Sequence, residues 1–320
     1  MVDVPSAPDP LPAADAAIVN PDDAAATERS SRRRWMLGIV LTTVLNLAAT
    51  ATTIGGLWLQ GRSVDLEYSK AVQEQMAAAQ EKISSPEVGD QVAGFGLLSD
   101  VMRNSPERQG YVLASAETYL LGQKAVAEKI PGLTGKLDLY VANPGTQAAV
   151  DLIRSRNIAQ DPGGPGQRAF NLTGMQVGSV RFNDVVMRST RGSGCHGNWT
   201  LWDKADLKDS EFRECNFEAA RFVGAKLQDV NFTGAFLNDA DFTDADLTKA
   251  DFGRAVFNSK TKFQGADLSG ATFTGKLGTT NFVGVKSIAG ADFSQAKEVE
   301  RAQNLRNAPG HEYARWPESP

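Results

Sequence analysis

From residue 170 onward the chain repeats a unit of five residues, most clearly in four consecutive units that begin at Ala235, Ala240, Ala245 and Ala250. A period of five fits neither the 3.6 residues of an α-helical turn nor the strict alternation of a flat strand. The chain is therefore expected to bend once per unit, so that four units close one square coil. The repeat predicts a solenoid, in which residues about twenty apart stack on the same wall.

The large apolar residues support this period, because they recur at intervals of about twenty residues and form four columns. The first three columns, which we predict as the structural core, are Phe212, Phe232, Phe252, Phe273 and Phe293; Leu207, Leu227, Leu247 and Leu268; and Phe222, Phe242 and Phe263, continued by Phe282. A mixed fourth column holds Phe217, Leu237, Phe257 and Leu277. Single-residue slips near 258–262, 274–276 and 283–288 are interpreted as insertions or deletions at corners.

The order of a small residue, Asp or Asn, and then Phe or Leu, as in Ala240-Asp241-Phe242, resembles the consensus of the bacterial pentapeptide-repeat family. The resemblance implies a mainly β fold, a right-handed quadrilateral β-helix over residues 169–297, with six coils and a length of roughly 30 Å. It also implies an inner column of small residues. This column contains Ala205, Cys215, Ala225 and Val230. Because Gly192, Gly194 and Gly197 replace large residues, the coil over 183–201 is expected to be a loop.

The N-terminal part of the chain has a different character. Residues 1–28 are rich in proline and carboxylates without apolar periodicity, which predicts a disordered tail. Residues 35–61 carry no ionisable side chain and follow Arg29, Arg32, Arg33 and Arg34. Such a run is long enough to cross a bilayer, so residues 29–62 are predicted as a transmembrane helix with a basic flank. The arginines favour a single-pass protein of the bacterial cytoplasmic membrane with a cytoplasmic N-terminus and an extracytoplasmic solenoid.

A cleaved signal is the alternative for the same segment. Residues 31–36 loosely resemble a twin-arginine motif, and Ala49-Thr50-Ala51 has the form of a cleavage site. In that case the segment would be removed by cleavage, and the rest of the chain would be exported without a membrane span.

Residues 63–158 are predicted to form a helical stalk and a small helical domain. The stalk is indicated by apolar residues three and four apart, which are Val64, Tyr68, Val72, Met76, Ala79 and Ile83. The span and the stalk together are candidates for homo-oligomerisation. Ser85-Pro86-Glu87 and Ser105-Pro106-Glu107 predict two helix starts, and residues 146–154 a third helix. Expected buried residues are Val88, Val92, Phe95, Leu98, Val101 and Met102, then Val112, Ala116, Tyr119 and Leu120, and finally Ala149, Val150 and Ile153.

This helical segment resembles the one that precedes the repeats in membrane-anchored members of the family. A Pro/Gly linker is predicted over 159–168. At the other end, residues 298–320 are predicted as a capping helix around Val299, Ala302 and Leu305, followed by a disordered tail from Pro309.

No pattern in the sequence predicts catalytic, cofactor-binding or metal-binding residues, so we expect no enzyme. The repeated carboxylates lie at one position of the unit, where turn formation explains them. Cys195-His196 lacks further metal ligands, and His196 is expected at the surface. Cys195 and Cys215 would stack on adjacent coils within reach of a disulfide, but free thiols in the core are the preferred interpretation.

Charge limits the functions that remain. A net charge of −5 opposes nucleic-acid binding through a general basic field. Residues 166–297 contain 16 Lys and Arg against 15 Asp and Glu, so the solenoid lacks the dense negative charge of a DNA mimic. The resemblance to pentapeptide-repeat proteins that protect or inhibit gyrase nevertheless makes a DNA-mimicking modulator of gyrase the alternative hypothesis. It rests on a possible acidic interaction patch formed by Asp239, Asp241, Asp244, Asp246 and Asp251.

The preferred hypothesis is a membrane-anchored, non-enzymatic interaction scaffold that presents its solenoid to an unknown protein partner. It predicts contact with the lipid bilayer through residues 35–61 and no direct contact with nucleic acid.

Overall fold

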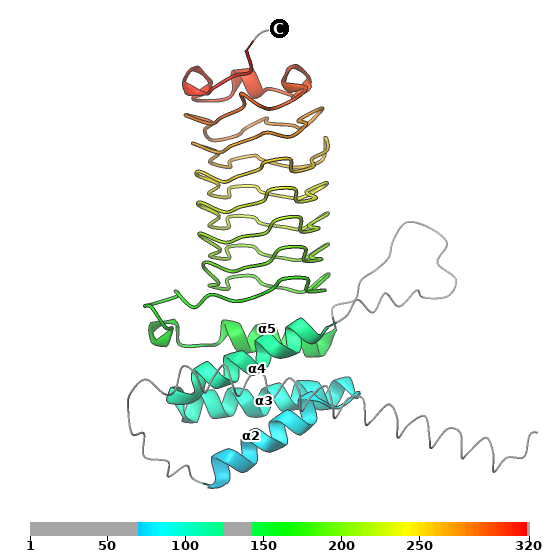
Figure 1. Cartoon of the computed structure of the whole chain (residues 1–320), viewed down its shortest axis with the longest axis vertical. Helices are drawn as coiled ribbons and strands as arrows, with labels where there is room; N and C mark the ends of the chain where they lie inside the picture. The colour runs from blue at the N-terminus through cyan, green and yellow to red at the C-terminus, as the bar shows by residue number, and fades with distance from the viewer. Residues whose placement is uncertain (1–69, 124–142, 319–320) are drawn as a thin grey trace, which may run out of the picture. The chain divides into compact units, whose positions relative to one another are not determined.

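A computed structural model describes residues 70–123 and 143–318, which form a group of helices followed by a solenoid (Figure 1). The helices are α2 (Lys70–Ile83), α3 (Val88–Asn104), α4 (Gln109–Gly122) and α5 (Pro144–Arg154). Short 3-10 helices occur at Pro106–Arg108 and Ile158–Gln160, and three more lie near the C-terminus. No helix within these described residues is long and apolar enough to cross a membrane. The tail over 1–28, the span over 29–62 and its signal alternative, and stalk residues Val64 and Tyr68 lie outside the described residues.

Helix α2 packs against α3 and does not form a free stalk. Ala79 and Ile83 are buried. The close approach requires Gly94 of α3, because a Cβ there would lie 2.7 Å from Ile83 Cγ1 and 2.8 Å from the Ala79 carbonyl oxygen. The described part of the predicted stalk therefore uses its apolar face inside the helical unit, where that face is not available for a coiled coil.

The predicted helix starts are partly correct. Ser105 precedes the 3-10 helix that opens with Pro106 and leads into α4, as expected. Helix α3 instead begins after Glu87, because the Ser85 hydroxyl accepts a hydrogen bond from the Glu87 backbone N–H and forms a turn. On α3 the predicted buried residues Val88 and Val92 are exposed, whereas the later ones face the core. Most predicted core residues of α3, α4 and α5 are buried; they are Phe95, Leu98, Val101, Met102, Val112, Ala116, Leu120, Ala149, Val150 and Ile153.

The solenoid is built from coils whose parallel β-bridges join residues about twenty apart (Figure 1). One residue of each five-residue unit forms the bridge, so the coil has four walls. Each corner is a turn closed by a backbone hydrogen bond, such as the one from the Ala225 N–H to the Phe222 carbonyl oxygen at 3.1 Å. The corner residue has a positive φ, for example 64° at Gly224 and 55° at Asp229. Glycine and Asp tolerate this conformation, which explains their frequency at this position.

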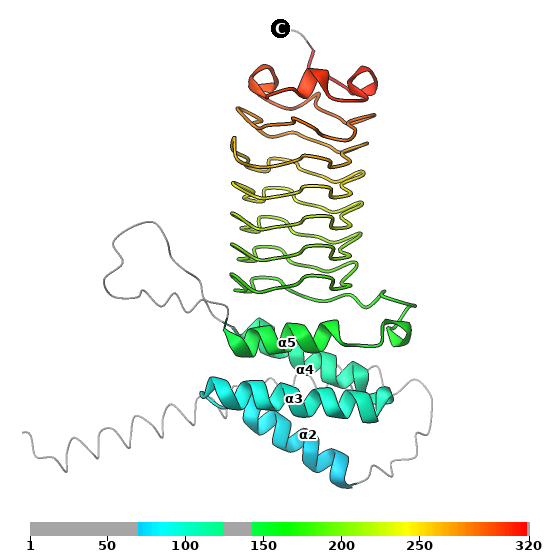
Figure 2. The ribbon, with the colours of Figure 1, turned by 180° about the vertical axis from the view of Figure 1, so that it is seen from behind.

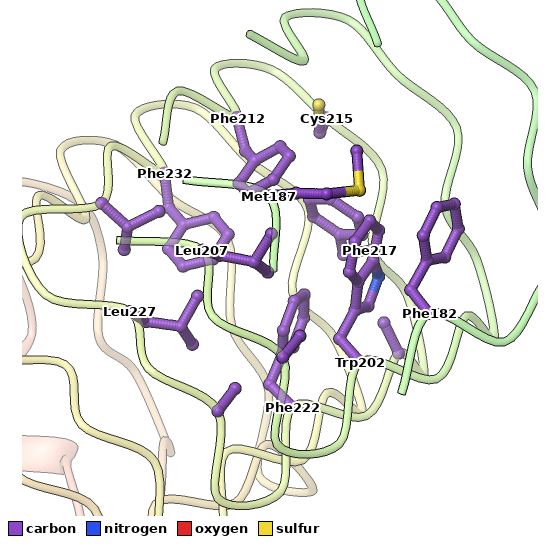
Figure 3. Packing of buried hydrophobic residues seen from close by; sticks show 14 of the residues in the cluster. Phe182, Met187, Trp202, Leu207, Phe212, Cys215, Phe217, Phe222, Leu227 and Phe232 are labelled. Atoms are coloured by element: carbon purple, nitrogen blue, oxygen red, sulfur yellow. The ribbon is translucent and has the colours of Figure 1, made fainter. Parts of the chain in front are cut away.

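Large side chains stack inside the solenoid in continuous columns (Figure 3). Successive rings of the first Phe column stack from Phe212 to Phe232 at 5.8 Å between centroids, and this stacking continues to Phe293. Trp202 extends the third column toward the N-terminal end, where its ring stacks 3.9 Å from Phe182. All thirteen residues of the three predicted core columns are buried, as is the column of small residues.

The segment over 183–201, predicted as a loop, is a regular coil. Gly192 and Gly197 stand at inward positions, and the rings of Phe212 and Phe217 in the next coil fill the space that larger side chains would occupy. A Cβ at either glycine would lie 2.6 Å from the ring of that phenylalanine. Gly194, by contrast, is a corner residue with φ of 64°. The glycines thus accommodate large neighbours and do not interrupt the coil.

The solenoid also extends past residue 297, so six coils is an underestimate. One ladder runs through Asn171, Arg191, Glu211, Asn231, Asp251, Thr272, Asp292 and Arg315. Across the three slips the bridge partners lie 21, 19 and 21 residues apart instead of 20, as in the bridges Asp241 to Lys262, Lys262 to Asn281 and Lys276 to Lys297. The bridge of Arg315 shows that the predicted disordered tail forms part of the solenoid at least to Arg315.

Within the described residues, which end at Glu318, no single capping helix closes the C-terminal end. Three 3-10 helices, Val299–Arg301, Leu305–Asn307 and His311–Tyr313, take the place of turns in a last coil. Val299 and Leu305 are buried, and the Trp316 ring stacks on Phe293 at 5.2 Å. This coil therefore continues the aromatic column and covers its end.

Helix α5 lies against the other end of the solenoid (Figure 2). Gln147 donates to the Arg181 carbonyl oxygen and accepts from the Arg181 N–H, while Arg154 donates to the carbonyl oxygens of Arg181 and Asn183. Side chains of the helix thus satisfy the backbone groups that the first coil leaves unpaired. The helical unit is consequently a cap on the solenoid.

The predicted linker is fixed in place by a buried ion pair. Arg156 donates through Nε and Nη2 to Asp161, and both side chains are almost fully buried. Arg156 also donates to the Val186 carbonyl oxygen and lies over the Phe170 ring. These contacts join the end of the helical unit to the first coils.

Candidate functional surface

Within residues 70–123 and 143–318 no group of three or more His, Cys, Asp or Glu side chains is placed to hold a metal ion. His196 is exposed, as predicted. Cys195 and Cys215 are joined by a disulfide with 4.6 Å between Cα atoms, so the prediction of free thiols is wrong. The cause is the coil geometry, which places inward positions of successive coils directly above one another.

The repeated carboxylates shape the coil. At the bridge position, Asp241, Asp246, Asp251, Asp267 and Asp292 each accept a hydrogen bond from the backbone N–H two residues later. Asp206 differs, since its carboxylate pairs with Arg188 at 2.7 Å. Turn formation therefore accounts for the carboxylates that recur at this position.

These hydrogen bonds also alter acidity. Burial raises the pKa of Asp241, but hydrogen bonds from the Thr243 hydroxyl and N–H and from Lys262 outweigh it and leave the pKa below its usual value. Burial likewise raises the pKa of Asp267, but hydrogen bonds from Ser269 and Lys286 outweigh it, so this pKa also lies below its usual value. A lowered pKa keeps a carboxyl group ionised at neutral pH, which suits an acceptor in a turn and does not suit a general acid.

The five residues of the proposed acidic patch do not share one wall. Asp241, Asp246 and Asp251 belong to three different ladders, and Asp239 and Asp244 are corner residues with φ of 59° and 57°. Cations accompany two of them, since Lys262 lies 3.0 Å from Asp241 and Lys260 lies 3.5 Å from Asp239. The structure therefore distributes this negative charge around the coil and partly neutralises it.

One wall differs from the others because it carries little charge over its first five coils. We define the neutral wall by a ladder and by the outward residues two positions after each of its members. The ladder consists of Gln176, His196, Asn216, Phe236 and Val256, and the other outward residues are Gly178, Asn198, Glu218, Asn238 and Asn258. A separate bridge between Lys276 and Lys297 follows further along the chain. Among the ten outward positions of the first five coils, Glu218 carries the only formal charge. At the ten equivalent positions of the opposite wall, six are charged: Arg188, Asp206, Lys208, Lys226, Asp246 and Asp267.

The neutral wall also exposes apolar side chains in its middle. Phe236 is 48% exposed and Val256 is 39% exposed, and they occupy the same position on neighbouring coils. Nothing in coil formation requires a Phe there, since the ladder residues of the three preceding coils, Gln176, His196 and Asn216, are polar and the inward neighbours already fill the core. Exposed apolar groups on a uniformly uncharged surface are typical of protein contact sites.

Sequence reasoning missed Phe236 and Val256, although a signal was present. The unit beginning at Ala235 reads Ala-Phe-Leu, and the unit beginning at Ala255 reads Ala-Val-Phe, where the three units between them have Asp at the second position. An apolar residue at the outward position of a known repeat marks a departure that packing does not explain.

A match to a family model agrees with this architecture. Residues 199–273 match the family model described as pentapeptide repeat region. Similar solved structures include QnrB1, a plasmid-mediated fluoroquinolone resistance protein, with 17% identity over 40% of this chain and 73% of that chain and a TM-score of 0.27. A pentapeptide repeat protein from the Arabidopsis thaliana thylakoid lumen is 34% identical over 32% of this chain and 65% of its own, with a TM-score of 0.21.

HetL, a pentapeptide repeat protein involved in heterocyst differentiation regulation from the cyanobacterium Nostoc sp. strain PCC 7120, is 20% identical over 39% of this chain and 75% of its own, with a TM-score of 0.19. No curated protein matches the chain. Together with the five-residue period and the four bridge ladders, the family match identifies the solenoid as a pentapeptide-repeat β-helix.

Proposed function

We propose that this protein is a non-enzymatic scaffold, tethered to a membrane through residues 35–61, whose neutral wall binds a protein partner. The observation that carries the proposal is the exposure of Phe236 and Val256 in the middle of a wall with a single formal charge over five coils. Burial of these side chains by a partner would remove apolar surface from water at little desolvation cost, because few charges surround them.

The solenoid suits such a role because its walls are held rigidly. Both ends are covered, by α5 and by the last coil, and aromatic stacks continue along the interior. A rigid wall loses little conformational entropy on binding, so more of the gain from burial remains as affinity.

Cross-linking tests the binding surface. A photoreactive phenylalanine analogue is placed at Phe236 in the full chain, expressed in its native cells. The matched control carries the same group at Val283, which is 51% exposed but lies on the neighbouring wall. We expect a covalent adduct with a protein from position 236 and little from 283. Equal labelling from both positions, or none from 236, would refute the neutral wall as the binding surface.

Extraction tests the tether separately. We expect the full chain, with epitopes at both ends, to remain in the membrane pellet at alkaline pH and to retain both epitopes. A chain with Leu41→Arg and Leu45→Arg should be released, since each Arg at the centre of a span is costly. Loss of the N-terminal epitope would instead support a cleaved signal, and release of the unaltered chain would refute the tether.

A further inference from the structure

The bond between Cys195 and Cys215 lies inside the solenoid. The two residues occupy the same inward position of adjacent coils, with 4.6 Å between their Cα atoms. They are only 2% and 0% exposed, and Figure 3 shows Cys215 in the interior beside Phe212. A reagent or an enzyme therefore cannot reach either sulfur atom while these coils are closed.

The two coils joined by the bond depend on each other for their core. The coil over 191–210 supplies two inward side chains of leucine size or larger, whereas the coil over 211–230 supplies four. At Gly192 and Gly197 the rings of the second coil fill the space left by the first. The first coil therefore gains little buried apolar surface until the second is in place, so the two are expected to close together.

Closure and oxidation must consequently occur in a fixed order. Cysteines are thiols when the chain is synthesised, and thiols that are already buried do not meet an oxidant. We propose that a disulfide-donating oxidoreductase forms the Cys195–Cys215 bond before the two coils close, and that the bond then stabilises the coil over 191–210, which has few large side chains of its own.

The reaction is an exchange between two thiols and one disulfide. The thiolate of one cysteine attacks the disulfide of the donor, forms a mixed disulfide and releases one donor sulfur. The thiolate of the other cysteine then attacks the mixed disulfide and closes the bond within the chain. Two electrons pass to the donor, which leaves as a dithiol carrying the two protons that the cysteines have lost.

This reaction also has a location. Disulfide donors act in oxidising compartments, so the solenoid would close outside the cytoplasm. Once the coils are closed, burial protects the bond from reductants. The bond forms whether or not the neutral wall has a partner, so failure of the proposed function would leave this reaction unaffected.

Counting thiols in native cells is the first test. The full chain is quenched in acid, denatured and treated with a maleimide-linked polyethylene glycol before and after reduction. We expect no shift on a gel before reduction and addition at both cysteines after it. Cys215→Ala cannot form the bond, so this control should react at Cys195 without reduction. Addition at both cysteines of the unaltered chain before reduction would overturn the proposal.

Refolding tests the order of events. The full chain, reduced in denaturant, is diluted into detergent with oxidised protein disulfide isomerase either present from the start or added after refolding. We expect the bond to form at least about tenfold faster in the first case. Hydrogen exchange at residues 191–214 reports closure, because N–H groups there pair with the next coil, as Gly192 does with the Glu211 carbonyl oxygen at 2.6 Å.

Two results of the refolding experiment need to be distinguished. Equal rates of oxidation in a chain whose coils have already closed would overturn the proposed order. Coils that remain open until the oxidant is added would show that closure requires the bond, which agrees with the proposal.

The stabilising role is tested by replacing both cysteines with alanine, which already occupies this inward column at Ala235 and Ala255. The variant therefore keeps the small side chain that the coil requires. We expect its melting temperature to fall by about 5–10 °C, since a bond that closes a loop of twenty residues is lost. Hydrogen exchange at residues 191–214 should become at least about tenfold faster.

A second bond in the same column is the matched control. Ala235→Cys with Ala255→Cys, added to the variant without Cys195 and Cys215, has the same separation of twenty residues. It should recover much of the melting temperature but leave the exchange at residues 191–214 fast. Equal protection of these residues by the second bond, or no change when the native cysteines are replaced, would refute the stabilising role.

Discussion

At Gly192 and Gly197 the absence of a side chain is a packing requirement. Each lies beneath a phenylalanine of the next coil, and a Cβ would come within 2.6 Å of the Phe212 or Phe217 ring. The lack of a side chain at these glycines therefore leaves the space that the two phenylalanine rings occupy. This is the reverse of their usual interpretation as breaks in a repeat.

Gly192→Ala should consequently destabilise the protein by about 1–3 kcal/mol through overpacking. Gly96→Ala in α3 is the matched control, because a Cβ there meets nothing within 4 Å and alanine favours a helix by about 1 kcal/mol. Denaturant unfolding measures both changes. A second substitution, Phe212→Leu, should recover part of the loss at Gly192. Equal effects of the two alanine variants would contradict this account of the coil.

The carboxylates of the turns predict a dependence of stability on pH. Hydrogen bonds from the Ser294 hydroxyl and N–H lower the pKa of Asp292, and those from neighbouring donors, against the opposing effect of burial, lower that of Asp241 and Asp267. A group with a lowered folded pKa stabilises the protein above its unfolded pKa of about 3.9, and that contribution disappears as pH falls through the folded value.

The melting temperature should therefore decline as pH falls below about 4. Replacing Asp241, Asp267 and Asp292 by Asn should reduce this acid-dependent decline and lower the melting temperature at neutral pH. Asp244→Asn, at an exposed corner, serves as the control. An unchanged acid profile in the triple variant would show that these turns do not control it.

Among the elements, the junction between helices and solenoid depends on one buried ion pair. The Arg156 and Asp161 side chains are 1% and 0% exposed, and Arg156 also binds the backbone of the first coil. Removing one member leaves the other charge buried without compensation.

Arg156→Met should therefore cost about 3–5 kcal/mol of folding free energy. Arg156→Met combined with Asp161→Leu should cost less than the single change, because no charge is then left buried. The exposed pair of Arg213 and Glu211 provides the control, where Arg213→Met should cost less than about 1 kcal/mol. Chemical denaturation followed by circular dichroism gives these values. A single variant as stable as the double would rule out the buried charge as the cause.

The period of the repeat was sufficient to predict the solenoid, because each unit specifies its own bend and its own inward side chain. Its ends could not be predicted in the same way. The last coil uses 3-10 helices and departs from the consensus, and the first coil is completed by side chains of α5 from another part of the sequence. Contacts of this kind depend on the relative placement of elements, which local patterns do not determine.

The stalk illustrates the same limit at the level of one helix. Spacings of three and four residues in α2 predict an apolar face but do not identify what covers it. That α3 covers this face depends on Gly94, since only a glycine at that position allows α2 to approach so closely. The periodicity of α2 alone does not reveal this contact. For the candidate surface, the position of Phe236 in its unit indicated exposure, but the lack of charge around it emerged only when the coils were stacked into walls.

Across the whole molecule, the account depends on the neutral wall being covered where the protein works. Phe236 and Val256 are accessible in the isolated chain, while Val283 offers a comparable side chain on another wall. These three residues can report occupancy directly because each reacts with hydroxyl radicals in proportion to its exposure.

Hydroxyl-radical footprinting of the full chain in native membranes, read out by mass spectrometry, is therefore the most direct test. The reference is the same chain diluted in detergent, where a weak contact dissociates. We expect Phe236 and Val256 to be oxidised several-fold less in membranes than in detergent, with Val283 unchanged. Equal oxidation of Phe236 in the two conditions would show that the wall is uncovered in the membrane and would contradict the account.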